Sequence, residues 1–201
     1  MKNVRGLIVF GLLIFGAVKL VGPSAQTGTN TIRAASVGSA AQPSAEMPSD
    51  ERRFLAAVAS YHNEYSNAST DFQKGVVFQN RANALRASLP SGLEAKGWVG
   101  TIYKLSSNGD GFGVLEITLS DDAWLTTWNN SFSDTDDHTL ILPTSPVYST
   151  LGDLKEGDKV KVSGLLLPDS GPDVVRTTDL SMGSKMTEPE FLFRFTSIEK
   201  L

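Results

Sequence analysis

One alternating segment, residues 154–168, constrains the fold of this chain more than any other part of the sequence. A Gly157-Asp158 pair favours a turn, and the side chains that follow alternate with the period of two that is typical of a β-strand. One set is apolar or small and the other mostly polar: Val160, Val162, Gly164 and Leu166 against Lys159, Lys161, Ser163 and Leu165. The pattern predicts a strand with one buried face. A helix signal before it and a Pro-Asp-Ser-Gly-Pro loop after it are typical of small Greek-key barrels.

Four more strands are predicted around this one. They cover residues 98–105, 112–119, 139–143 and 191–198, and a short helix is predicted to begin at Ser145-Pro146. Three strands, a helix and two strands follow one another in the order of an OB-fold. The fold class is therefore predicted to be mainly β, with a five-stranded OB-fold Greek-key barrel over residues 97–201. Residues 121–137 are expected to form a polar insert that carries Trp124 and Trp128.

A helical segment is predicted before the barrel, over residues 50–96. An apolar stripe at helical spacing supports it, and residues 67–69 interrupt the pattern, so two helices or one kinked helix are expected. The stripe consists of Phe54, Val58, Tyr61 and Tyr65. Packing against its own domain is the preferred interpretation, and a partner-binding face is the alternative.

The first 49 residues have the composition of an export signal and a tether. Residues 1–22 begin with Lys2 and Arg5 and continue with an apolar run, which predicts a signal peptide or an uncleaved signal-anchor helix. Residues 23–49 are rich in small and polar residues and are expected to form a disordered linker. The predicted location is the bacterial inner membrane, anchored through residues 6–22, with the C-terminal domain in the periplasm. Cleavage would instead give a secreted or periplasmic protein.

The charge is distributed unevenly along the chain. The net charge is -4, but residues 97–201 hold twice as many acidic as basic residues. A domain of this charge repels phosphate backbones on average, which disfavours nucleic acid as a partner. The chain has no cysteine, so disulfides and thiolate metal sites are excluded.

No set of residues in the sequence has the spacing of a known catalytic site. The turn at residues 106–111 resembles the middle of a calcium-binding loop, but neither end of the loop supplies the required carboxylate, so a plain hairpin turn is preferred. The loop that carries Asp134, Asp136, Asp137 and His138 offers oxygen and imidazole ligands for a loose cation site, and a solvated loop is the preferred interpretation. A non-enzymatic protein without a cofactor is therefore predicted.

A ligand-binding surface is predicted from aromatic and basic side chains. OB barrels present ligands to the face of strands two and three, where aromatic rings can stack on bases or sugars. The candidate residues are Tyr103, Trp124, Trp128, Lys159 and Lys161. Trp98 and Tyr103 would lie on opposite faces of a regular strand, so at least one of them is expected in the core.

Several short motifs resemble an uncharacterised bacterial group classed with the tRNA-anticodon-binding-like OB domains. They are Gly97-Trp98-Val99-Gly100, Thr127-Trp128-Asn129-Asn130, residues 154–164 and Pro189-Glu190-Phe191. The resemblance covers about residues 50–201 and implies an OB barrel behind an N-terminal anchor, without assigning functional residues.

These observations predict a membrane-tethered or exported binding module whose partner is an unknown envelope protein or small ligand. The alternative is a single-stranded nucleic-acid binding protein, which would use the same aromatic side chains together with the lysines.

Overall fold

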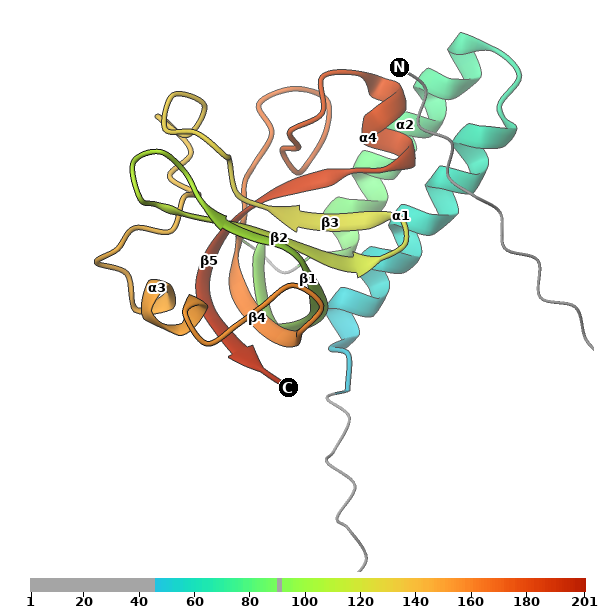
Figure 1. The fold of residues 1–201 in the computed structure, drawn as a ribbon. Coiled ribbons are helices and arrows are strands. Elements are labelled where there is room, and N and C mark those ends of the chain that lie inside the picture. Colours follow the sequence, from blue (N-terminus) through green and yellow to red (C-terminus); the bar gives the residue numbers. More distant parts are fainter. Residues whose placement is uncertain (1–45, 90–91) are drawn as a thin grey trace, which may run out of the picture. The chain divides into compact units, whose positions relative to one another are not determined.

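The structure is a computed structural model that describes residues 46–89 and 92–201, all of which belong to one compact unit. Two helices lie side by side and precede a small β-barrel (Figure 1). The predicted signal or anchor segment and most of the predicted linker lie outside the described residues. None of the described helices is both long enough and apolar enough to cross a membrane.

Helices α1 (Ser49–Asn67) and α2 (Asp71–Ser88) confirm the predicted break at residues 67–69, and the two-helix alternative is the observed one. Asp50 and Glu51 lie in the first turn of α1, where the helix dipole favours acidic groups. The Thr70 hydroxyl accepts a hydrogen bond from the Gln73 amide, and the Gln73 side chain accepts one from the Thr70 amide, which forms a capping box. The chain is therefore turned sharply between two well-defined helices.

Five strands form a closed barrel in the order β1-β2-β3-β5-β4. They are β1 (Glu94–Ser107), β2 (Gly113–Ser120), β3 (Ala123–Thr126), β4 (Lys159–Leu166) and β5 (Glu190–Lys200). Only β3 and β5 run parallel, and β1 is long enough to pair with both β2 and β4. A short helix, α3 (Pro146–Leu151), precedes β4 as predicted. A closed barrel of mixed strand direction behind two helices is the arrangement expected of an OB-like barrel.

Strands β4 and β5 approach each other closely and bury apolar side chains inside the barrel. A Cβ atom on Gly164 would collide with the carbonyl oxygen of Arg194 on the neighbouring strand, so only glycine fits where β4 and β5 change register. The predicted inward face of β4 is buried, as are Phe191, Phe193 and Phe195 of β5. Ile198 is buried as well, because the register change shifts the alternation of β5.

The prediction of the third strand was wrong. Trp124 does not lie in a polar insert but in β3, and residues 139–143 contribute only a single bridge, between Ile141 and Gly113. Leu140 and Ile141 are buried although they form no strand. Their apolar run therefore resembled a buried strand more than the four residues of β3 did. Helix α4 (Met182–Thr187) was also missed: it is too short for a helical period to show, and it lacks the proline after the N-cap residue that predicted α3.

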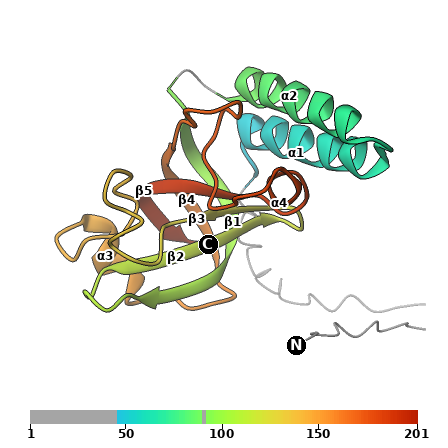
Figure 2. The ribbon, with the colours of Figure 1, turned by 90° about the horizontal axis from the view of Figure 1, so that it is seen from above.

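The helices are attached to the barrel through α1. The buried ring of Phe54 lies 5.1 Å from that of Trp98 on β1 and 5.0 Å from that of Phe191 on β5. Asp50 accepts a hydrogen bond of 3.0 Å from the Trp98 indole nitrogen. Figure 2 shows the two helices beside the barrel, with α4 next to them. The expected packing of the stripe against its own domain is confirmed for Phe54 and Val58, which are both buried.

Candidate functional site

The register of three strands brings acidic and aromatic side chains together on the outer face of the barrel. Glu116 of β2 is paired with Lys104 of β1 on one side and with Thr126 of β3 on the other. Two residues before Thr126 on the same strand, Trp124 is paired with Glu190 of β5. Because side chains alternate along a strand and Leu115, Ile117, Leu125 and Phe191 are buried inside, these residues face outwards.

Two adjoining depressions cross this face and share Glu116 and Glu190 as lining residues, so together they form one groove. The first has a volume of about 280 Å³ and includes Trp128. The second has a volume of about 230 Å³ and includes Tyr103 and Trp124. We call the two depressions the β3 groove. Its lining residues are Tyr103, Lys104, Val114, Glu116, Trp124, Thr126, Thr127, Trp128, Asn129, Ser133, Thr178, Asp179, Ser184, Glu188 and Glu190.

The β3 groove carries an excess of negative charge. Four carboxylates line it, from Glu116, Asp179, Glu188 and Glu190, against the single ammonium group of Lys104. Within residues 46–89 and 92–201, none of the four makes an ion pair shorter than 4.0 Å. A hollow lined with one sign of charge concentrates ions of the opposite sign. The groove is therefore suited to a cation.

Burial and mutual repulsion raise the pKa of two of these acids. The pKa of Glu116 is raised mainly by burial and further by the charge of Glu190, with Lys104 opposing. The pKa of Asp179 is also raised mainly by burial, and the charge of Glu190 adds to it although the Glu190 amide and Lys185 oppose it. Both carboxyl groups would be stabilised as anions by a positive charge bound between them.

Hydrogen bonds hold the groove in shape at both ends. The Trp128 indole nitrogen donates to Asp137 at 2.7 Å, and Arg176 donates to the other oxygen of the same carboxylate at 2.6 Å. Glu190, which borders both depressions, accepts a hydrogen bond from the Thr178 hydroxyl, and its amide donates to Asp179 at 3.2 Å. The lining side chains are thus positioned before any ligand arrives.

Three of the five predicted binding residues lie in the groove. Tyr103 follows Ile102 where the register of β1 shifts, and its side chain is 58% exposed. It lines the same depression as Trp124, while Trp128 lines the other. Trp98 is fully buried, which confirms that one of the pair Trp98 and Tyr103 belongs to the core.

The two predicted lysines lie elsewhere. Lys159 and Lys161 are on β4, paired with Thr101 and Val99 of β1, and neither lines the groove. The basic group that does line it is Lys104.

The acidic side chains of the groove were not predicted as a set. Glu116 lies on the predicted strand 112–119 without a spacing typical of a site, and Glu190 belongs to the motif Pro189-Glu190-Phe191. The pairing of β3 with β5 brings them together, and it joins segments more than 60 residues apart. No local pattern contains that information.

The carboxylates of the 134–137 loop hold the loop together. Asp134 accepts hydrogen bonds from the amide and hydroxyl of Thr139, at 2.6 and 2.7 Å, and from the Leu140 amide at 3.1 Å. Asp137 binds Trp128 and Arg176, as described above. Asp136 and His138 are exposed. In the part of the chain that the structure describes, no three acidic or histidine side chains are placed to share a metal ion.

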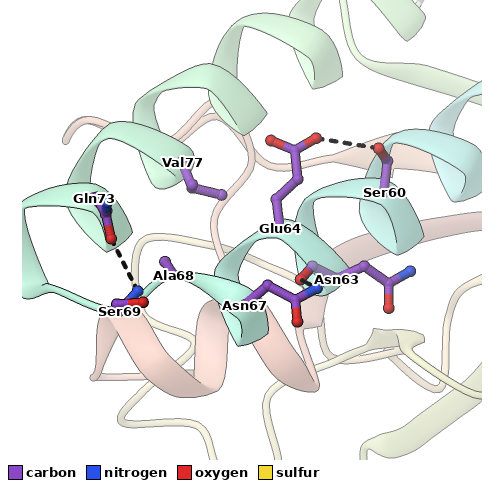
Figure 3. Close-up of a pocket in the computed structure, with 8 residues that line it drawn as sticks. All are labelled: Ser60, Asn63, Glu64, Asn67, Ala68, Ser69, Gln73 and Val77. Atoms are coloured by element: carbon purple, nitrogen blue, oxygen red, sulfur yellow. Dashed lines mark hydrogen bonds between the residues drawn. The ribbon is translucent and has the colours of Figure 1, made fainter.

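A further hollow, of about 610 Å³, lies between the C-terminal part of α1 and the N-terminal part of α2 (Figure 3). Its polar side chains mostly bind their own helices: Asn63 donates to the Ala59 carbonyl, Asn67 to the Asn63 carbonyl, and the Gln73 side chain accepts from the Ser69 amide. These polar side chains are used to bond nearby backbone groups of the two helices, so their presence does not indicate a binding site.

Comparison with known proteins adds no relative: the chain matches no model of a protein family, and no curated protein sequence matches it. The resemblance to the tRNA-anticodon-binding-like OB domains therefore stays a prediction.

Proposed function

We propose that this protein is a non-enzymatic binding module, built on an OB-fold, that holds a positively charged group of its partner in the β3 groove. The observation that carries the proposal is the combination of four carboxylates without an ion-pair partner in the described residues and the aromatic rings beside them, of which Tyr103 is exposed and Trp124 and Trp128 are half-buried. Carboxylates attract an ammonium or guanidinium group, and aromatic faces stabilise it further by cation–π interaction.

The depression that each residue lines indicates its role in binding. Tyr103 and Trp124 would contact the cation from the depression that also holds Asp179 and Glu188. Glu116 and Glu190, which border both depressions, would contribute charge to a ligand in either one. Thr126, which is paired with Glu116, lines the first depression, and Trp124, which is paired with Glu190, lines the second.

A single-stranded nucleic acid is the rival ligand. An OB-like barrel with an exposed tyrosine favours it, whereas the carboxylates repel phosphate. The two proposals differ in the residues they need: an oligonucleotide would depend on Lys159 and Lys161, and a cationic partner on Glu116, Glu190 and Trp124.

The experiment is a calorimetric titration of the full-length protein with a lysine-rich peptide at low salt, using matched variants. Glu116→Gln and Glu190→Gln each keep the shape of the side chain and remove its charge. Each is expected to weaken binding about tenfold or more, the size typical of a lost charged contact. Glu199→Gln, at the exposed end of β5 outside the groove, is the matched control and should bind like the wild type. Equal affinity of all four proteins would refute the proposal.

We also propose that the module is exported and tethered to the inner membrane through residues 6–22, or released into the periplasm by cleavage. The supporting feature is the charged start and apolar run of the sequence. Fractionation of cells that produce the full chain tests this proposal. Recovery of the intact protein in the cytosol, without cleavage, would contradict both forms of it.

A further inference from the structure

We infer that the partner in the β3 groove is a polypeptide segment that carries both basic and apolar side chains, and not a small amine. The inference rests on the proposed function and specifies its ligand. It is based on two exposed apolar side chains, Phe132 and Leu180, each of which is next in sequence to a residue that lines the groove.

Each of these side chains adjoins a residue that lines the groove. Phe132 is 91% exposed and precedes Ser133, which lines the depression that contains Trp128. Leu180 is fully exposed and follows Asp179, which lines the depression that contains Trp124. An acidic groove with an apolar side chain near each end is complementary to a segment with basic residues at its centre and apolar residues around them.

The backbone that carries Phe132 is fixed by a set of short-range hydrogen bonds. The Ser133 amide donates to the Asn130 side chain at 2.9 Å, and the Thr135 hydroxyl donates to the Phe132 carbonyl at 2.9 Å. The Ser131 hydroxyl donates to the Asp110 carboxylate, which ties the loop to the turn between β1 and β2. Phe132 is therefore exposed on an ordered loop.

The backbone around Leu180 is fixed in a similar way. Asp179 before it accepts a hydrogen bond from the Glu190 amide, and the Ser181 hydroxyl after it accepts one of 3.0 Å from the Ser184 amide at the start of α4. Phe132 and Leu180 are thus exposed on backbone that is held in place by hydrogen bonds, and a partner that covered them would bury apolar surface.

The division of the groove into two depressions also favours a polypeptide. The depressions have volumes of about 280 and 230 Å³ and meet at Glu116 and Glu190. Each is suited to individual side chains. A chain that places successive side chains in the two depressions would also reach the apolar residues beyond them.

The test titrates the full-length protein with three probes. The first is a ten-residue peptide that alternates lysine with leucine, the second alternates lysine with serine, and the third is spermidine. The wild type is expected to bind the lysine–leucine peptide about tenfold more tightly than the other two, the gain typical of one or two good apolar contacts. Phe132→Ser and Leu180→Ser should each remove most of that advantage. Both side chains are exposed, so neither change should disturb folding.

Leu142→Ser is the matched control, because Leu142 is 48% exposed but does not line the groove. It should bind all three probes like the wild type. Equal affinity for the three probes, all lost in Glu190→Gln, would overturn the polypeptide inference and leave a simple cation site. A loss of peptide binding in Leu142→Ser as large as in Phe132→Ser would also overturn it. Failure of every cationic probe to bind would remove the proposed function itself.

Discussion

At the scale of single residues, Glu51 is the most unusual side chain in the described structure. It is fully buried at the start of α1 and accepts a 2.9 Å hydrogen bond from the Val99 amide, while its other oxygen has no partner. Burial raises its pKa from 4.5 to about 7, with Asp50 adding to the shift and the Val99 amide opposing it. Below about pH 7, this carboxyl group is therefore mostly protonated in the folded protein.

The stability of the protein is expected to fall as pH rises through this range. As pH rises, Glu51 loses its proton at a lower pH in the unfolded chain than in the folded protein. Its contribution to the free energy of unfolding is therefore most favourable below pH 4.5 and is lost by about pH 7. The loss amounts to about 3 kcal/mol. Glu51→Gln removes the titrating group and should be more stable than the wild type at pH 8 but not at pH 4. Urea unfolding at both pH values measures the difference, and Glu94→Gln, at a partly exposed position of β1, is the control. The same pH dependence in wild type and Glu51→Gln would contradict this reading.

Proton release is expected when a cation enters the β3 groove. The pKa values of Glu116 and Asp179 are raised in the free protein, and a bound positive charge would lower them. Binding should therefore release protons at mildly acidic pH, and the release should disappear at higher pH where both groups are already ionised. Calorimetric titration in two buffers with different ionisation enthalpies measures the number of protons. Proton uptake would show that the ligand does not meet these carboxylates as a cation.

At the scale of elements, a buried ion pair joins α2 to the loop that follows β4. Arg81 and Asp173 are both fully buried side chains, 2.6 Å apart, and Arg81 also donates to the carbonyl of Lys185 in α4. The pair thus connects the helices to the segment that carries Asp179 and α4. Removing one partner leaves the other charge buried without compensation.

Arg81→Met is expected to destabilise the protein by about 3–5 kcal/mol, because Asp173 would remain charged in the interior. The double variant Arg81→Met/Asp173→Leu removes both charges and should recover a large part of that loss. Thermal or urea unfolding of the two variants measures the recovery. A double variant no more stable than Arg81→Met would show that the charge pair itself is not the source of the effect.

The strands were predictable from the sequence where their two faces differ. In β4, Val160 and Val162 alternate with Lys159 and Lys161, so the buried face is visible in the sequence. The four-residue β3 gives too short a pattern, and its parallel partner β5 is distant in the sequence. The same limit applies to the site: Tyr103, Trp124 and Trp128 could be predicted from residue type, but the acids around them depend on the β3–β5 pairing.

At the scale of the whole described domain, barrel closure limits how a partner can bind. Each of the five strands is paired on both sides over part of its length, so none of them is a free edge along its whole length. This arrangement favours recognition through side chains on the outer surface over addition of a strand. The acidic balance of the domain agrees with a basic partner and opposes a phosphate backbone.

The most direct test of the central claim is a comparison of two ligands for the full-length protein at low salt. One is the lysine–leucine peptide and the other a labelled single-stranded oligonucleotide. We expect the peptide to bind and the oligonucleotide not to bind, because the β3 groove repels phosphate where electrostatic attraction should be strongest. Tight binding of the oligonucleotide, weakened by replacing Lys159 and Lys161 and unaffected by Glu190→Gln, would contradict the account.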